Sequence, residues 1–205
     1  NSCFAVGQGD IPFLISGHID EIALQVQNID DKGFIHFIKD GCSDPKVLLG
    51  SAVKIICSKG VNIDGVIGKT PIHIEWEGEE KDKVTKVKDM KIDCGFETKE
   101  EALEYVSIGD PIVVQDIPLQ LGVNRFSGCG LDDKVGVFIV GEVLKELTKH
   151  ELTKLKVFGA ACVQEEVGAV GASIIAKNLD PMYSIDYDVT FATDDGYVSA
   201  DEWGD

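Results

Sequence analysis

The sequence is short of positive charge. It carries 19 Lys and Arg residues against 36 Asp and Glu residues, a formal net charge of −17 over 205 residues. A protein this acidic repels phosphate backbones, so we expect no nucleic-acid partner. It also lacks an apolar stretch of membrane-spanning length, so we expect no membrane partner. The apolar fraction of 44% is typical of a globular protein with a buried core.

The six cysteines include no CxxC pair, and no secretory leader precedes them. Scattered single cysteines indicate reduced thiols, so we expect a cytoplasmic protein. The sequence begins with strand-like residues and ends in SADEWGD without a closing helix or strand. We therefore expect it to be part of a longer polypeptide.

Residues 25–120 differ in pattern from the residues on either side. Short β-rich pieces such as KVLLGSAVKIIC and GVIGKTPIHIEW alternate there with turn residues, a pattern typical of a small barrel or sandwich. One short helix is expected at residues 98–106, where Thr98 is a candidate N-cap. We predict an inserted β domain at 25–120 that divides one α/β domain into residues 1–24 and 121–205.

The flanking segments predict an α/β sheet. The apolar run from Ile11 to Ile15 is typical of a buried strand. After Gly130, apolar residues recur at helical spacing and predict a core-facing helix. A strand at 155–163, a Gly/Ala-rich helix at 167–178 and a strand at 182–192 are expected to follow. This alternation predicts a sheet with helices on both faces.

Acids and one histidine follow the predicted strands or begin the predicted long helix. These residues are His18, Asp20, Asp132, Asp133, Glu165, Glu166, Asp186, Asp188, Asp194 and Asp195. Because ligands of open α/β sheets bind beyond the carboxyl ends of the strands, we expect these clusters to converge. An unpaired buried carboxylate would be costly there, and cations would remove that cost.

The residue types suit a hydrolytic metal site. His18 and Asp20 are two apart in an extended segment, so one can bind a metal while the other orients it. Glu165 and Glu166 are adjacent and diverge, so one can ligate while the other acts as general base. Asp132 has two oxygens and could bridge two cations, which sit roughly 3.5 to 4 Å apart in two-metal hydrolases.

Each cluster also has a plainer interpretation. Asp132 and Asp133 fit the acids that commonly begin helices, each worth roughly 0.3 to 1 kcal/mol there. The two adjacent Glu residues could begin the helix that follows them, and His18 could be a hydrogen-bonded core histidine. The occurrence of all the clusters at strand ends or helix starts of one domain favours the metal site.

Four segments together resemble the dinuclear metalloaminopeptidase family that includes glutamyl aminopeptidases and the tetrahedral TET aminopeptidases. GHIDEIALQV is similar to that family's HxDEIG segment and LDDKVGVFIV to its LDDR segment with the helix that follows. VQEEVGAVGA is similar to its QEEVGxxGA segment, and DVTFATD to its DVTxAxD segment. The resemblance covers nearly the whole chain and keeps the family's order.

The resemblance implies a role for each matching residue. His18, Asp132 and Asp188 would hold one divalent metal ion, and Asp132 and Glu166 the other, with zinc or cobalt as the metal and manganese as an alternative. Glu165 would be the general base, and Asp20 would orient His18. The peptide bond between Asp132 and Asp133 would be cis, and the inserted β domain would join dimers that build a dodecamer. The substrates would be peptides, cut at their amino-terminal bond.

The sequence also departs from the family pattern. Ala23, Lys134 and Phe191 stand where Gly, Arg and His are frequent, and no counterpart of the family's last histidine ligand follows His150. A non-catalytic metal-binding scaffold is therefore a second hypothesis. Glycoside hydrolysis by paired carboxylates is a poorer third, because Glu165 and Glu166 are adjacent, whereas that chemistry needs carboxyl groups about 5 to 9.5 Å apart across a sugar bond. The preferred amino-terminal residue of the substrate stays open.

Overall fold

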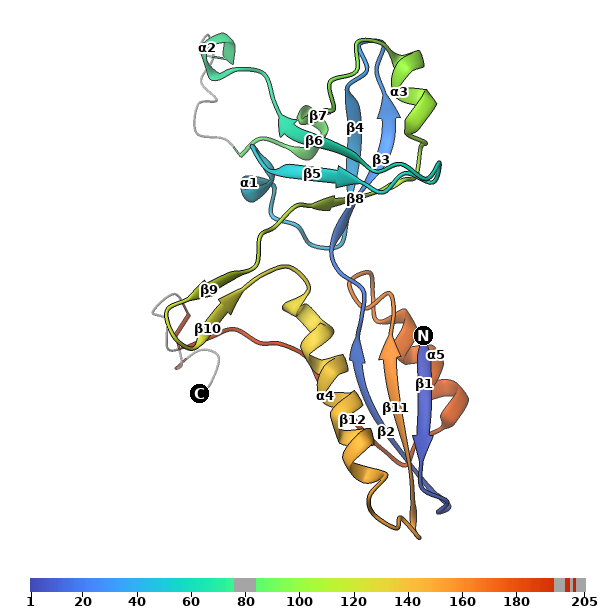
Figure 1. Cartoon of the computed structure of the whole chain (residues 1–205). Helices are drawn as coiled ribbons and strands as arrows, with labels where there is room; N and C mark the ends of the chain where they lie inside the picture. The colour runs from blue at the N-terminus through green and yellow to red at the C-terminus, as the bar shows by residue number, and fades with distance from the viewer. Residues whose placement is uncertain (76–83, 194–197, 200, 202–205) are drawn as a thin grey trace. The chain divides into compact units, whose positions relative to one another are not determined.

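The computed structural model describes residues 1–75, 84–193, 198, 199 and 201 (Figure 1). The chain forms two compact units, one made of Asn1–Glu21 with Pro118–Asp205 and one made of Ile22–Ile117. The second unit is thus inserted into the chain of the first, where the sequence analysis placed an insert at 25–120. Among the described helices, none is both long and apolar enough to cross a membrane.

The first unit is built on a four-stranded sheet. Its strands are β1 (Ser2–Val6), β2 (Ile11–His18), β11 (Leu155–Cys162) and β12 (Tyr183–Asp186), in the order β1-β11-β2-β12. β11 and β12 run parallel to β2, while β1 is antiparallel to β11. A separate two-stranded sheet joins β9 (Leu119–Leu121) to β10 (Arg125–Ser127). Because β2, β11 and β12 are parallel, their carboxyl ends lie at the same edge of the sheet.

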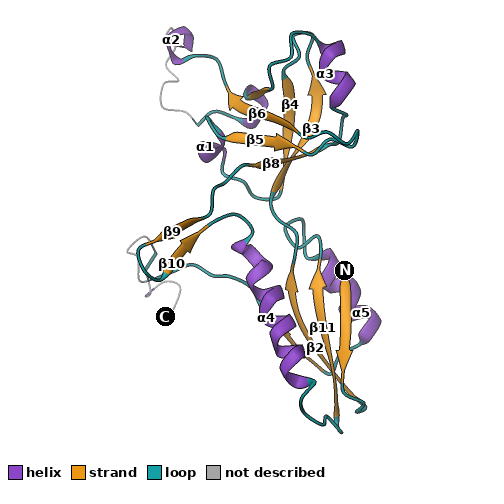
Figure 2. Ribbon diagram, in the orientation of Figure 1, coloured by secondary structure: helices purple, strands orange, loops and turns teal. Residues whose placement is uncertain are grey.

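Two helices cover opposite faces of this sheet (Figure 2). Leu14 of β2 packs with α5 (Val170–Leu179), and its neighbour Ile15 packs with α4 (Leu131–Leu147). Successive strand residues point to opposite faces, so one strand supplies both cores. The predicted α/β sheet with helices on both faces is confirmed.

Two predicted boundaries in this unit were wrong. The helix predicted from residue 167 begins at Val170, because Gly168 and Ala169 have φ angles of 119° and 54°, which a right-handed helix cannot contain. The strand predicted to reach residue 192 ends at Asp186, where its pairing with β2 stops. The apolar residues beyond Asp186 continue the strand-like pattern, but residues 187–193 form no strand in the described structure, so the sequence pattern alone overestimated the length of the strand.

The inserted unit is a closed six-stranded barrel with strand order β3-β4-β7-β6-β5-β8. Its strands are β3 (Ala23–Ile29), β4 (Ile35–Asp40), β5 (Ala52–Ile55), β6 (Ile63–Gly68), β7 (Lys91–Asp93) and β8 (Pro111–Val114). The short helical segments are α1 (Pro45–Leu48), α2 (Ile72–Glu75), the 3-10 turn η1 (Val87–Asp89) and α3 (Lys99–Tyr105). The Thr98 side chain caps α3 by accepting from the Glu101 amide, as predicted.

The barrel interior is filled by alternate residues of its strands. Val53 and Ile55 of β5 are buried, as are Ile35 and Phe37 of β4. This period of two is the pattern of a barrel whose inward side chains form the core. Each such side chain contributes roughly 1.5 to 3 kcal/mol through burial, so the inserted unit has a hydrophobic core of its own.

Asp30 connects the turn after β3 to two other strands, and we expect this carboxylate to make barrel stability depend on pH. It accepts from Lys91 at 2.7 Å, contacts His36 Nε2 at 3.3 Å, and accepts from the Lys32 and Phe34 amides at 3.1 Å. Burial alone would raise the pKa of Asp30, but these hydrogen bonds outweigh it and lower the pKa from 3.8 to about 2.

Because the folded pKa lies below the ordinary value, the stabilisation is present above pH 4 and is lost as the pH falls towards 2. We expect Asp30→Asn to lower the free energy of unfolding by about 1 kcal/mol at pH 7, after allowance for solvent screening. Denaturant unfolding at pH 7 and near pH 2 measures the difference, with the exposed neighbour Asp31→Asn as control. An equal loss at both pH values would contradict the prediction.

Candidate metal centre

His18 is the last residue of β2, and its side chain is only 3% exposed. Its Nδ1 lies 3.0 Å from the backbone carbonyl oxygen of Asp20, and its Nε2 lies 2.9 Å from Oδ1 of Asp132. A neutral imidazole has one N–H, so it can donate a hydrogen bond to only one of these two oxygens. If Nδ1 carries the hydrogen, the lone pair of Nε2 faces the Asp132 carboxylate. A proton or a metal cation between these two groups would remove their repulsion. The geometry around His18 therefore fits a cation.

Two adjacent carboxylates in the first turn of α4 have different environments. Asp132 and Asp133 have non-helical backbone angles, and the peptide bond between them is cis, as the resemblance implied. The Asp133 side chain is 1% exposed and accepts from the amides of His18 at 3.2 Å and Gly136 at 3.0 Å. Asp132 is 56% exposed and directs Oδ1 towards His18. Asp133 thus anchors α4 to β2, and Asp132 stays accessible to a ligand.

Gly17 permits this close approach of α4 to β2. A Cβ atom at Gly17 would lie 2.8 Å from Oδ2 of Asp133 and 2.9 Å from the backbone of Gly136. Side-chain atoms do not normally come this close, so any larger residue would push the start of α4 away from β2. The glycine beside His18 is therefore a requirement of the site's geometry.

Asp20 links His18 to the pair of glutamates. Its carboxylate lies 3.5 Å from Nδ1 of His18, and it accepts from the amides of Glu165 at 3.2 Å and Glu166 at 3.3 Å. Gln164, just before the pair, has a φ of 60°, a strained conformation for a residue other than glycine and one that clusters at functional sites. Oε2 of Glu165 lies 3.9 Å from Nε2 of His18. Asp20 thereby fixes the segment that carries both glutamates.

Two sets of donor atoms lie close enough to hold metal ions. One set joins His18 to Asp132 and Glu166, and the other joins His18 to Asp133 and Asp188, with the donor atoms of each set within 4.8 Å of one another. Each of the four residues that the sequence analysis assigned to metals belongs to one of these sets, and His18 belongs to both. The set with Asp188 contains Asp133, where the resemblance implied Asp132. Asp194 and Asp195 lie outside the described residues.

The electrostatics of this cluster show an excess of negative charge. Burial raises the pKa of Glu166, and the charge of Asp132 raises it further. For His18, burial lowers the pKa, but the hydrogen bond and charge of Asp132 and the contacts with Asp20 raise it overall. Both shifts favour proton uptake by crowded carboxylates and their histidine, and a divalent cation would supply the same positive charge.

Two contacts at this edge of the sheet were missed by the sequence analysis. Asp133 was treated as a helix-start acid, whereas its carboxylate bonds the β2 backbone at His18. Ser16, directly after the predicted apolar run, was given no role, whereas its hydroxyl donates to Asp186. Gly17, next to His18, was the available signal for the close approach of another segment.

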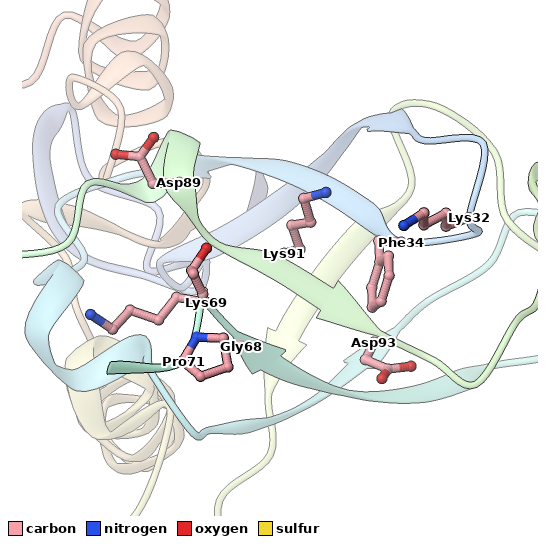
Figure 3. Close-up of a pocket in the computed structure, with 9 residues that line it drawn as sticks. Lys32, Phe34, Gly68, Lys69, Pro71, Asp89, Lys91 and Asp93 are labelled. Atoms are coloured by element: carbon pink, nitrogen blue, oxygen red, sulfur yellow. The ribbon is translucent and has the colours of Figure 1, made fainter. Parts of the chain in front are cut away.

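A separate hollow lies on the barrel (Figure 3). It is lined by Lys32, Phe34, Gly68, Lys69, Thr70, Pro71, Asp89, Lys91 and Asp93. Lys91 is already engaged by Asp30 and lies 5.4 Å from the centre of the Phe34 ring. The lining mixes both charges and contains none of the predicted site residues, so the candidate site stays at the sheet edge.

The structure thus has an α/β sheet with one histidine and several carboxylates gathered beyond the carboxyl ends of its parallel strands. The sequence profile of the M42 glutamyl aminopeptidase family matches residues 2–204, and the chain belongs to this family. This result confirms the resemblance described in the sequence analysis.

Individual relatives agree. The chain is 29% identical over 180 residues to a lysyl aminopeptidase of Pyrococcus furiosus, covering 87% of this chain and 51% of that protein. A TET aminopeptidase from the marine sediment archaeon Thaumarchaeota archaeon SCGC AB-539-E09 has a TM-score of 0.88 and 32% identity, over 97% of this chain and 56% of that one. The TET1 peptidase of Pyrococcus horikoshii has a TM-score of 0.83 and 38% identity, over 96% and 59%. The chain spans about half the length of the curated relatives it matches.

Proposed function

We propose that the protein is a metal-dependent aminopeptidase that uses two divalent cations to hydrolyse the first peptide bond of peptides. The observation that carries this proposal is the arrangement around His18. Its two ring nitrogens face Asp20 and Asp132, and the donor atoms of Glu166 and Asp188 lie in sets that include it. Membership of the M42 family supports the same activity.

The proposed ligands combine this arrangement with the family resemblance. His18, Asp132 and Asp188 would hold one cation, and Asp132 and Glu166 would hold the other. The arrangement places Asp132 with His18 and Glu166, and it places Asp188 with His18 and the buried Asp133. Imidazole and carboxylate donors suit zinc, cobalt and manganese. When bound, such cations supply Lewis-acid polarisation of the scissile carbonyl and lower the pKa of a water molecule.

Glu165 is the proposed general base. Its carboxylate lies close to His18 without belonging to either set of candidate ligands, and its side chain is 39% exposed, so water and substrate can reach it. It takes a proton from the attacking water and returns it to the nitrogen of the leaving amine. Asp20 positions Glu165 by accepting from its amide and holds His18 through its backbone carbonyl.

Assembly and location are further parts of the proposal. The barrel has its own core and none of the proposed catalytic residues, so we assign it to contacts between subunits in dimers that build a dodecamer. A relative from Pyrococcus horikoshii assembles into a tetrahedron or a large octahedral shell. The six cysteines are scattered singly along the sequence with no CxxC pair, which supports a cytoplasmic location.

Metal analysis beside an activity assay tests the proposed function. We expect the full-length protein to bind two divalent cations per chain and to release chromophore from aminoacyl-p-nitroanilides. A chelator should abolish this activity, and added zinc or cobalt should restore it. Two bound cations without hydrolysis across a panel of acidic, neutral and basic aminoacyl substrates would favour a non-catalytic scaffold.

A further inference from the structure

Ser16 and Asp186 form a bond across the sheet that the proposed reaction does not use. Ser16 lies within β2 and is 2% exposed, whereas Asp186 is the exposed last residue of β12. The two residues are paired in the strand register, and the Ser16 hydroxyl donates to Oδ1 of Asp186. A hydroxyl that donates to a carboxylate forms one of the stronger kinds of hydrogen bond in proteins.

This bond marks the point where β12 leaves the sheet. The pairing of β12 with β2 ends at Asp186 and Ser16, and the amide of the next residue, Tyr187, donates to the Ser16 carbonyl at 2.8 Å. Asp188 follows in a segment without regular structure. His18 lies two residues beyond Ser16 on β2, and Asp188 lies two residues beyond Asp186. The hydrogen bond between Ser16 and Asp186 therefore joins β2 and β12 two residues before each proposed ligand.

We infer that Ser16 and Asp186 form a clamp that sets the position of Asp188 relative to His18 and so shapes one of the two cation sites. This inference rests on the proposed function. Among the described strands, β12 pairs with β2 alone, so the contact with Ser16 lies at the end of its pairing. Ser16 and Asp186 are positioning residues, because they act on the cation through His18 and Asp188.

A purely structural role for this hydrogen bond predicts that its loss lowers folding stability, whereas the clamp predicts that its loss lowers the affinity for a cation. Asp186 is exposed, so water can replace the hydroxyl that it would lose. Alanine at position 16 would lie beside Ala160, its register partner on β11, in a sheet whose core on that side is apolar. Loss of the clamp should therefore change folding stability little while it changes the affinity of one cation site.

The test uses Ser16→Ala and Asp186→Ala in the full-length protein, titrated with Co²⁺ alone and followed by calorimetry and visible absorption. We expect two binding events in the unmodified protein and about tenfold weaker binding at one of them in each variant, as for other residues that orient metal ligands. The double variant should bind no more weakly than the single variants, because both remove the same bond. Asp186→Asn keeps an acceptor for the hydroxyl and should retain most of the affinity. Ser184→Ala, an exposed serine on the same strand, is the matched control.

The outcomes separate the clamp from the proposed function. Unchanged affinity at both sites in Asp186→Ala would overturn the clamp and leave the proposed function standing. Equal weakening of both sites, or a loss of affinity that follows a loss of thermal stability, would also overturn it. Fewer than two Co²⁺ ions bound by the unmodified protein would overturn the proposed function and the clamp with it. Because Asp186 is exposed, its variants decide the question even if Ser16→Ala fails to fold.

Discussion

Replacing Glu165 with Gln in the full-length protein is expected to remove nearly all aminopeptidase activity and to leave the metal content unchanged. Glutamine keeps the size of the side chain but cannot accept a proton from water. Loss of a general acid–base group typically lowers the rate by roughly 10² to 10⁴-fold. Because Glu165 lies outside both sets of candidate ligands, the cations should still bind. The measurements are kcat for an aminoacyl-p-nitroanilide and metal stoichiometry by elemental analysis.

A matched control separates this effect from the loss of one negative charge. Glu142→Gln makes the same change at an exposed residue of α4 that pairs with Lys145. It should leave both kcat and metal content unchanged. A Glu165→Gln protein that retains full activity would contradict the general-base assignment, and one that loses its metals would make Glu165 a ligand.

The elements that could be predicted are those with a clear apolar pattern. The strand from Ile11 is a continuous apolar run, and the long helix after Gly130 has apolar residues at helical spacing. These two elements and the strand from Leu155 are all present. The end of β12 could not be read in this way. Tyr187, Val189 and Phe191 extend the strand-like pattern, but a strand also needs a neighbour to bond, and neighbours are set by tertiary structure.

The candidate site, like the fold, could be predicted only in part from the sequence. The residue types at the strand ends predicted which side chains would gather, since His18 and the acids follow their strands directly. The contacts between them depend on close approaches of distant segments. Asp20 was expected to orient His18, and the structure adds that its carboxylate binds the amides of Glu165 and Glu166. No spacing in the sequence indicates a bond across 145 residues.

These contacts explain why the proposed site is spread over so much of the chain. Asp133 bonds α4 to the end of β2, and Ser16 of β2 bonds to the end of β12. Asp20, two residues after β2, bonds to the segment after β11. β2 and the residues just after it are thus the common support on which α4 and the segments after β11 and β12 are aligned.

Asp132, Glu166 and Asp188 should differ in how many cations their loss removes. If Asp132 bridges, Asp132→Asn should weaken both sites by more than the roughly 10 to 100-fold that changes around metal ligands typically cost. Glu166→Gln and Asp188→Asn should each weaken one site, and not the same one. Asp132 is 56% exposed, so its substitution should leave the fold intact. Co²⁺ titration of the three variants measures the pattern, with the exposed Asp10→Asn as control. Weakening of only one site in Asp132→Asn would contradict the bridge. Asp132, which lies 2.9 Å from Nε2 of His18, would then be a ligand of one cation only, and each cation would have ligands of its own.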